Sequence, residues 1–541
     1  FLDGAIEDLN AETLADIVKE YQPGLTGLPV NVMQLNQARL YAECLKRACP
    51  DIPLVAGGPL ISAVSRDVFE FLPGIDYAVF SEGEYALPAL VRHLQGQENL
   101  ESVPNLIYQE DSQTRLNQVV RVDPLDELPL PDYSLVERYL PAYPGVFPCL
   151  HKPSFSILCS RGCPFDCQFC SSPVTWGRRV TTRGLDSIIR EIRMLADRYG
   201  AREVFIQDDT LNLNRQWFLS LCDALIESGL NKRLAFKAPF RANRNLVDEE
   251  LLSTARRAGF WMLFYGVESG SPRMLERMKK RIGIDEIIRA FELTHRAGIQ
   301  TFASFILGFP GETSDTIEAS FDLTRRIQPH YGGFGVAMPF PGTGLYEDVR
   351  RLGLADHMEP EDYDLAKAGL RTESLSHEQL CRFASRGDTL IHEVSLTGRE
   401  ASATWNTRPL DEAAFRSRIH PVYIPSPLPP DFMGEFRVKI ENLSRFNWPG
   451  AESPDGTFNL YLSYHWLDEN GQPVCWDGLR TKLGRDIPPG GTTVADARVL
   501  TPARAGSYTL QFDLVQENAG WFSDRGCEAL GVGVVVRGMC E

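Results

Sequence analysis

The sequence predicts an α/β protein: an incomplete Rossmann-like (flavodoxin-like) domain, a partial (β/α)6 barrel and a C-terminal antiparallel β-sandwich. Three observations support this prediction. Apolar strand-like runs alternate with amphipathic helical patterns to about residue 350, proline-rich segments interrupt the pattern, and short alternating strands with Gly and Pro turns follow. A chain of 541 residues has room for three to four domains. We place the domains at residues 1–122, 151–400 and 431–541, and linkers at 123–150 and 401–430.

Composition and charge narrow the possible partners and location. Lys and Arg number 55 against 72 Asp and Glu, a net charge of −17, and no dense basic block appears, which argues against nucleic acid as a partner. No apolar run reaches roughly 18 residues, so we expect no membrane span. Without a signal-peptide pattern, the protein is expected to be cytoplasmic. The first four residues resemble the end of a strand, which predicts that the first domain lacks its N-terminal part.

The first domain combines amphipathic helices with short apolar runs. Helices are expected at 13–21 and 37–48, and strands at 25–32, 52–56 and 77–80. This alternation indicates a parallel sheet with right-handed crossovers. The second and third strands end in Gly57-Gly58-Pro59 and Ser81-Glu82-Gly83-Glu84. Because ligands of such sheets bind beyond the carboxyl ends of the strands, these turns are candidate binding elements.

The second domain repeats a strand and a helix six times. Its strands are expected at 155–159, 203–207, 234–238, 262–267, 301–307 and 333–338, with helical patterns such as 185–198 and 284–297 between them. Six such units indicate an open or partial barrel. The chemistry of a barrel lies at the carboxyl ends of its strands, so the loops that follow the six strands are the candidate site.

The last domain reads as alternating strands with Gly and Pro turns. They are expected at 435–440, 458–466, 492–499, 507–515 and 531–536, which indicates an antiparallel sandwich. Four tryptophans stand out in it: Trp448, Trp466, Trp476 and Trp521. Stacked indole rings can bind sugars, but aromatic residues of sandwiches more often form the core, and both interpretations stay open.

Four of the twelve cysteines fall within twelve residues, directly after the first barrel strand. Cys163, Cys167 and Cys170 share one short loop, where soft sulfur ligands suit an iron–sulfur cluster or zinc. A structural zinc site needs a fourth ligand, which either Cys159 or His151 would have to supply. The spacing favours a cluster over zinc.

A Cys-x-x-x-Cys-x-x-Cys loop after the first strand of a six-unit barrel resembles the radical S-adenosylmethionine (SAM) superfamily. This resemblance implies that Cys163, Cys167 and Cys170 each hold one iron of a [4Fe-4S] cluster, and that SAM chelates the fourth iron through its amino and carboxylate groups. It also implies that the ring of Phe169 packs near the adenine of SAM. Read alone, Phe169 is equally well explained as a core residue.

Later strand ends resemble the same family. The resemblance implies that Asp208 and Asp209 bind the amino group of SAM, that Glu268 with Ser269 binds the ribose, and that the loop with Gly308 and Pro310 borders the adenine. Arg241 is placed to neutralise the SAM carboxylate. Each motif also has a plain structural interpretation, as helix caps for the carboxylates, a solvent-facing side chain for Arg241 and a tight turn for Gly308.

The first domain resembles the cobalamin-binding domain that precedes the barrel in one subgroup of this superfamily. The resemblance implies that backbone and side chains of Gly57, Gly58, Glu82, Gly83 and Glu84 approach the corrin ring. A generic flavodoxin-like sheet is the alternative. The Asp-x-His-x-x-Gly signature, which supplies a lower axial His to cobalt, does not occur in the sequence.

These observations predict a radical SAM enzyme that cleaves SAM reductively to a 5′-deoxyadenosyl radical, with cobalamin-dependent methylation of an unactivated carbon. The expected cofactors are a [4Fe-4S] cluster, SAM and cobalamin. The expected partners are a small-molecule or glycan-linked substrate and an electron donor such as flavodoxin or ferredoxin. One alternative is a non-methylating radical SAM oxidoreductase or cyclase, and another is a non-catalytic zinc- and carbohydrate-binding protein. No catalytic acid or base is assigned.

Overall fold

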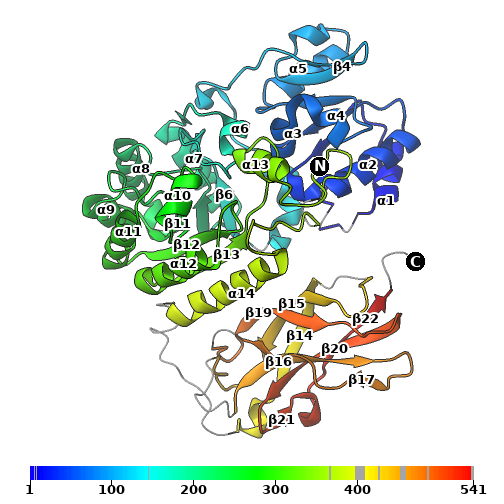
Figure 1. The fold of residues 1–541 in the computed structure, drawn as a ribbon, viewed down its shortest axis with the longest axis vertical. Coiled ribbons are helices and arrows are strands. Elements are labelled where there is room, and N and C mark those ends of the chain that lie inside the picture. Colours follow the sequence, from blue (N-terminus) through cyan, green and yellow to red (C-terminus); the bar gives the residue numbers. More distant parts are fainter. Residues whose placement is uncertain are drawn as a thin grey trace. The chain divides into compact units, whose positions relative to one another are not determined.

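The computed structural model describes the chain except for residues 5, 8, 144, 365–366, 396–408, 424–426, 451–457, 484–485 and 538–541. The chain divides into two compact units, residues 1–396 and 397–541 (Figure 1). No helix within the described parts combines the length and apolar character needed to cross a bilayer.

The N-terminal sheet has five strands in the order β1 to β5. Its strands are β1 (Thr26–Pro29), β2 (Leu54–Gly57), β3 (Tyr77–Val79), β4 (Leu106–Glu110) and β5 (Gln113–Leu116). Its helices are α1 (Ala11–Tyr21), α2 (Leu35–Ala48), α3 (Pro59–Val64), α4 (Val68–Phe71) and α5 (Ala86–Leu94). The first three strands are parallel and were predicted, which confirms the Rossmann-like fold class.

The sequence did not predict the hairpin of β4 and β5, which pairs antiparallel to β3 and makes this sheet mixed. Its turn is formed by Asp111 and Ser112, both with positive φ, where Gly or Asn is the usual signal. The composition of the turn therefore gave little indication of a hairpin.

The barrel sheet is parallel and has the order β13-β12-β11-β10-β9-β6. Its strands are β6 (Ser154–Ile157), β9 (Glu203–Ile206), β10 (Ala235–Phe240), β11 (Phe260–Glu268), β12 (Gln300–Leu307) and β13 (Tyr331–Val336). All six predicted strands are thereby confirmed. β6 and β13 are the free edges, so the barrel is partial. A short antiparallel pair, β7 (Ser160–Arg161) and β8 (Thr181–Thr182), follows the first strand.

Helices pack on the outer side of this sheet (Figure 1). They are α7 (Leu185–Arg198), α8 (Arg215–Glu227), α9 (Glu249–Arg257), α10 (Pro272–Arg277), α11 (Ile284–Arg296), α12 (Ser314–Ile327) and α14 (His377–Val394), while the short helices α6 (Ser172–Trp176) and α13 (Gly344–Leu352) follow the first and last strands. The core between sheet and helices is apolar, with buried Phe218, Phe260 and Phe291 among its largest side chains.

The described part of the predicted linker 123–150 contains a 3-10 helix, Tyr133–Ala142. A buried ion pair anchors its end inside the barrel. The Lys237 ammonium lies 2.7 Å from the Glu203 carboxylate, and both side chains are fully buried. Lys237 also donates to the carbonyls of Val146 and Pro148, and Glu203 accepts from the Leu150 N–H. The linker thus closes the barrel at the amino ends of the strands.

The C-terminal unit is a sandwich of antiparallel sheets, as predicted. One sheet has the order β14-β15-β19, and the other has the order β17-β16-β20-β21 with β18 and β22 attached. The strands are β14 (Ser417–Tyr423), β15 (Met433–Asn442), β16 (Leu460–Leu467), β17 (Pro473–Cys475), β18 (Thr481–Lys482), β19 (Thr492–Leu500), β20 (Gly506–Gln516), β21 (Gly520–Trp521) and β22 (Leu530–Val536). β14 lies within the predicted linker 401–430, part of which is outside the described residues.

Candidate active site

The loop after β7 carries the three cysteines and has a fixed shape. Gly162 has a φ of +96°, and a Cβ there would lie 2.1 Å from the Arg179 carbonyl oxygen, so only glycine fits. The Cys163 N–H donates to the Gly177 carbonyl and the Cys170 N–H donates to the Cys167 carbonyl. The loop thus presents Cys163, Cys167 and Cys170 at the carboxyl end of the first barrel strand.

The surroundings of the three sulfur atoms suit thiolate ligands of a metal cluster. Burial raises the pKa of the Cys163 thiol, and raises that of Cys170 to about 11. Nearby donors oppose this shift: the Phe165 N–H lowers the pKa of Cys163 and the Ser172 N–H lowers that of Cys170. The Arg241 guanidinium donates to the Cys167 sulfur at 3.6 Å. Buried thiols with N–H donors are stabilised as thiolates once a metal replaces the proton.

Cys159 and His151, the two candidates for a fourth zinc ligand, do not lie with the three cysteines of the loop. Cys159 is fully buried in the core between sheet and helices, where burial holds its pKa well above the usual value. His151 donates its backbone N–H to Glu203 at the amino ends of the strands, whereas the cysteine loop is at the carboxyl ends. Among the described residues, no three His, Cys, Asp or Glu side chains form a site for a single metal ion.

Asp208 and Asp209 follow the second barrel strand, β9, and contact different neighbours. Asp208 is buried, and its two oxygens accept hydrogen bonds from the Cys159 N–H at 2.7 Å and the Ser160 hydroxyl at 2.5 Å. Burial raises its pKa to about 6. Asp209 instead accepts a hydrogen bond from the Ser172 hydroxyl, beside Cys170. Asp208 therefore holds the start of the cysteine loop, and Asp209 lies on the sulfur side.

The predicted residue Arg241 is held tightly in this site. Its guanidinium lies over the Phe165 ring, 3.6 Å from the centroid, and donates to Cys167, Asn243 and the Lys280 carbonyl. Arg241 thereby joins the cysteine loop to the segment after α10. It brings a positive charge to the sulfur of Cys167.

Glu268 has an ion-pair partner that the sequence analysis missed. The ammonium of Lys280 lies 2.6 Å from the Glu268 carboxylate, and both side chains are nearly buried. The same ammonium is 5.8 Å from the ring centroid of Phe169. Two basic residues beside Lys280, followed by Ile282 and Gly283, were the only sequence signal for this segment. Ser269 is fully buried and within hydrogen-bond distance of the Ser320 hydroxyl, which makes it a packing contact in this structure.

The loop after the fifth strand is built around a buried carboxylate. Gly308 and Gly311 have φ values of +85° and +83°, and Pro310 lies buried between them. The Glu312 carboxylate accepts the Gly308 N–H at 2.5 Å, while its other oxygen is buried without a partner among the described residues. Burial raises the pKa of Glu312 to about 7.

The two turns of the first domain differ in what they contact. A Cβ on Gly58 would lie 2.7 Å from the Val30 carbonyl oxygen, so the β2 turn requires glycine, while a Cβ on Gly57 would meet open space. Glu82 and Glu84, on either side of Gly83, both bind Arg161 of β7, at 2.8 and 2.5 Å. Their carboxylates therefore connect the first domain to the start of the cysteine loop.

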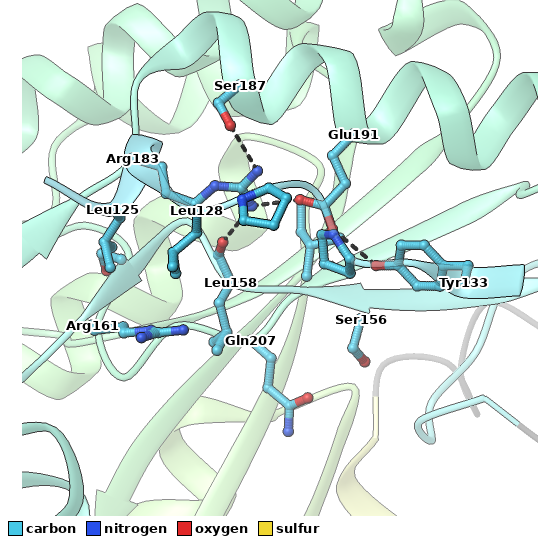
Figure 2. Close-up of a pocket in the computed structure, with 14 residues that line it drawn as sticks. Leu125, Leu128, Tyr133, Ser156, Leu158, Arg161, Arg183, Ser187, Glu191 and Gln207 are labelled. Carbon is cyan, nitrogen blue, oxygen red and sulfur yellow. Dashed lines mark hydrogen bonds and ion pairs between the residues drawn. The ribbon is translucent and has the colours of Figure 1, made fainter. Parts of the chain in front are cut away.

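A cavity of about 370 Å³ lies beside the first barrel strand (Figure 2). The segment of residues 125–133 and the helix α7 enclose it. The Arg183 guanidinium lies 2.5 Å from the Glu191 carboxylate, and Tyr133 donates to the same carboxylate at 2.9 Å. The exposed side chains of Ser156 and Gln207 also line it.

This fold and this loop define a class: a partial parallel barrel with a three-cysteine site, preceded by a Rossmann-like domain. The sequence profile of the radical SAM superfamily matches residues 157–324, and that of the B12 binding domain matches residues 1–91. Residues 157–324 therefore form a radical SAM domain with a B12-binding domain before it, and the protein is an enzyme. A [4Fe-4S] cluster, SAM and cobalamin are the cofactors that these two domains imply.

Relatives agree with this assignment. The chain is 29% identical, over 70% of its length and 81% of the relative, to an uncharacterized methyltransferase of Pyrococcus horikoshii. It is 27% identical, over 67% of its length and 58% of the relative, to the anaerobic magnesium-protoporphyrin IX monomethyl ester cyclase of Cereibacter sphaeroides.

A solved structure shares the fold. The radical SAM methyltransferase TsrM from Kitasatospora setae, with cobalamin and a [4Fe-4S] cluster bound, superposes with a TM-score of 0.56 at 20% identity, over 66% of this chain and 72% of TsrM. Neither sequence profile reaches the C-terminal sandwich.

Proposed function

We propose that this protein methylates an unactivated carbon of a small-molecule substrate in a cobalamin-dependent radical SAM reaction. The observation that carries the proposal is the link from the cysteine loop to both neighbouring sites. Arg241 joins Cys167 to the Lys280 segment, and Arg161 joins the start of the loop to the Glu82 turn of the B12-binding domain. The cysteine loop is thus linked both to the Lys280 segment of its own domain and to the B12-binding domain.

Different residues of the site would bind the cluster and SAM. Cys163, Cys167 and Cys170 would hold the cluster. When bound, the cluster supplies the electron that cleaves SAM to methionine and a 5′-deoxyadenosyl radical, and cobalamin supplies a methyl carrier. The carboxylate of Asp209, on the sulfur side of its strand, is the proposed acceptor for the SAM ammonium, because a buried ammonium needs a charged acceptor.

The Glu268 and Lys280 pair would contact the rest of SAM beside Phe169. A carboxylate accepts hydrogen bonds from vicinal ribose hydroxyls, so Glu268 suits the ribose. Lys280 neutralises Glu268 in the absence of ligand and is proposed to bind the SAM carboxylate, since the Arg241 guanidinium is already engaged by three acceptors. Gly308 and Pro310 are proposed to border the adenine, as the sequence predicted.

The substrate would lie inside the barrel, where hydrogen abstraction needs exclusion of water and oxygen. Phe264 and Phe302 are paired residues of the adjacent strands β11 and β12, and their half-buried rings lie with centroids 5.0 Å apart. Apolar walls of this kind favour an apolar portion of a small molecule. A flavodoxin- or ferredoxin-type protein is the proposed electron donor, in the cytoplasm.

Anaerobic reconstitution tests the proposal. The protein should bind about four irons and, with a reductant and SAM, release 5′-deoxyadenosine. Cys163→Ala should abolish both, and Cys381→Ala, which changes an exposed cysteine outside the loop, should leave both intact. The proposal would be contradicted if Cys163→Ala formed 5′-deoxyadenosine, or if the wild-type protein bound no iron.

The similarity to the cyclase supports a second candidate, a radical SAM oxidation without methyl transfer. SAM labelled in its methyl group separates the two. A methyltransferase leaves the label in the product, whereas a cyclase-type reaction leaves it in methionine.

A further inference from the structure

The outer face of the second sandwich sheet carries a buried polar cluster outside both cofactor domains. Along β16 the side chains of Leu462, Tyr464 and Trp466 enter the core, so Ser463 and His465 face the other way. An outward face of an antiparallel sheet is normally solvated. Here Ser463, His465 and Asp513 of the neighbouring strand β20 are each only 1% exposed.

Two tryptophans cover this face, and they are not the ones that build the core. Trp448 and Trp466 are 0% and 1% exposed and belong to the core, as the structural interpretation of the tryptophans expects. Trp476 stacks on His465 with centroids 4.1 Å apart and planes at 16°, and Trp521 of β21 lies over the same ring at 4.3 Å. The imidazole thus contacts both indoles, stacked on Trp476 and tilted by 60° against Trp521.

His465 has an incomplete set of hydrogen bonds. Its Nδ1 faces the Trp476 carbonyl oxygen, which can only accept, so Nδ1 carries the proton. Nε2 is then an acceptor, and it is buried without a partner among the described residues. An unpaired buried acceptor is costly. A donor for Nε2 would have to come from outside those residues.

Trp476 offers a flat apolar surface. The indole is 48% exposed although His465 covers one of its faces, so its exposed area lies on the other face and the edge. An indole face exposed in this way can stack on a ligand, because burial of aromatic surface is favourable.

A fixed set of charged groups lies next to this surface. The Arg480 guanidinium lies over the Trp521 ring at 5.2 Å and binds Glu517 at 2.6 Å and Asp477 at 2.5 Å. It also donates to the Ser463 hydroxyl. The side chain of Asp477 is 66% exposed and that of Glu517 is 32% exposed, so both retain oxygens that can accept.

We propose that this face, built by Trp476, Asp477, Arg480 and Glu517 over His465, binds a neutral saccharide. The carbon-bound hydrogens of a sugar ring pack on an indole face, while its edge hydroxyls donate to carboxylates and accept from a guanidinium. The three charged groups sum to −1 and Asp513 lies beneath them, which disfavours anionic ligands such as nucleotides or acidic sugars. The inference is independent of the reaction proposed for the barrel.

The test uses the 541-residue chain and four neutral disaccharides: maltose, cellobiose, mannobiose and N,N′-diacetylchitobiose. Saturation-transfer NMR detects binding, and titration calorimetry measures the dissociation constant. At least one disaccharide should bind at millimolar concentration. Asp477→Asn and Trp476→Leu should each weaken it by about tenfold or more, the loss expected for one charge-assisted hydrogen bond or one stacking contact. Val474→Ala, which changes an exposed residue of β17, should have no effect.

The His465→Phe variant distinguishes a role of His465 in saccharide binding from a role in the stability of the fold. The variant keeps a flat ring in contact with both indoles. It removes the unpaired acceptor and also the hydrogen bond to the Trp476 carbonyl, so thermal unfolding should change little while saccharide affinity falls. Absence of binding to all four disaccharides would overturn the proposal, as would full affinity in both Trp476→Leu and Asp477→Asn. The proposal would also be overturned if a lysine-rich peptide bound and none of the four sugars did. In that case the carboxylates of Asp477 and Glu517 would form a peptide site.

Discussion

The guanidinium of Arg161, in the strand that leads into the cysteine loop, lies 2.8 Å from the Glu82 carboxylate of the B12-binding domain. Its side chain is 16% exposed and that of Glu82 is 4% exposed. The second oxygen of Glu82 accepts the Val122 N–H at 2.7 Å, and the Arg161 guanidinium also lies over the Trp176 ring. This pair therefore holds a turn that was predicted to approach cobalamin against the loop that carries the cluster ligands.

Arg161→Met should destabilise the first unit strongly. Loss of one partner leaves the Glu82 carboxylate buried without its cation, which costs about 3–5 kcal/mol. Differential scanning calorimetry should show a clear drop in the melting temperature of this unit. The matched control is Arg179→Met, whose ion pair with Asp123 is on the surface, with Arg179 83% exposed, and is worth at most about 1 kcal/mol. Equal effects of the two substitutions would contradict the role given to Arg161.

Lys280→Met should weaken SAM binding more than cluster assembly. A charge-assisted hydrogen bond to the SAM carboxylate contributes about 1.5–3 kcal/mol, so the dissociation constant should rise by at least about tenfold. Equilibrium dialysis of labelled SAM against the iron-loaded protein measures this directly. Lys279→Met, an exposed neighbour, should bind SAM as the wild type does. An unchanged affinity in Lys280→Met would show that Lys280 only neutralises Glu268.

Local sequence patterns were enough to predict most of the fold. Strand periodicity placed all six barrel strands, and the spacing of Cys163, Cys167 and Cys170 indicated their shared loop. The partners of those residues depend on packing between distant segments: Arg161 meets Glu82 across 79 positions, and the Gln168 N–H meets the Met278 carbonyl. No local pattern reports such contacts.

Side-chain direction distinguishes between interpretations that the sequence left open. Asp208 and Asp209 are adjacent in the chain, but one turns back to the strand and the other turns toward the sulfur side. Cys159 lies in the bend between β6 and β7, and its side chain is buried in the core between sheet and helices. Likewise the tryptophans of the sandwich divide into two core residues and two on the outer face.

Stability of the first unit should fall as pH rises through neutrality, because of Glu312. Burial raises its pKa from 4.5 to about 7 in the folded protein, so the folded state retains a proton that the unfolded state releases. The favourable contribution is complete below about pH 4.5 and is lost as pH rises through 7, by about 3 kcal/mol in total. Glu312→Gln should flatten this dependence. Melting temperatures of both proteins between pH 5 and 8 measure it, and parallel curves would contradict the assignment.

The buried pair of Lys237 and Glu203 should be needed to seat the linker in the barrel. Lys237→Met leaves a fully buried carboxylate without its cation, and two linker carbonyls, those of Val146 and Pro148, without a donor. We expect a loss of about 3–5 kcal/mol and faster proteolysis of the linker. Lys237→Met combined with Glu203→Gln removes the unpaired charge while keeping an acceptor for the Leu150 N–H, so it should recover part of the loss. Limited proteolysis and calorimetry of the single and double variants measure this coupling, and a double variant less stable than Lys237→Met would show that the charge pair is not what anchors the segment.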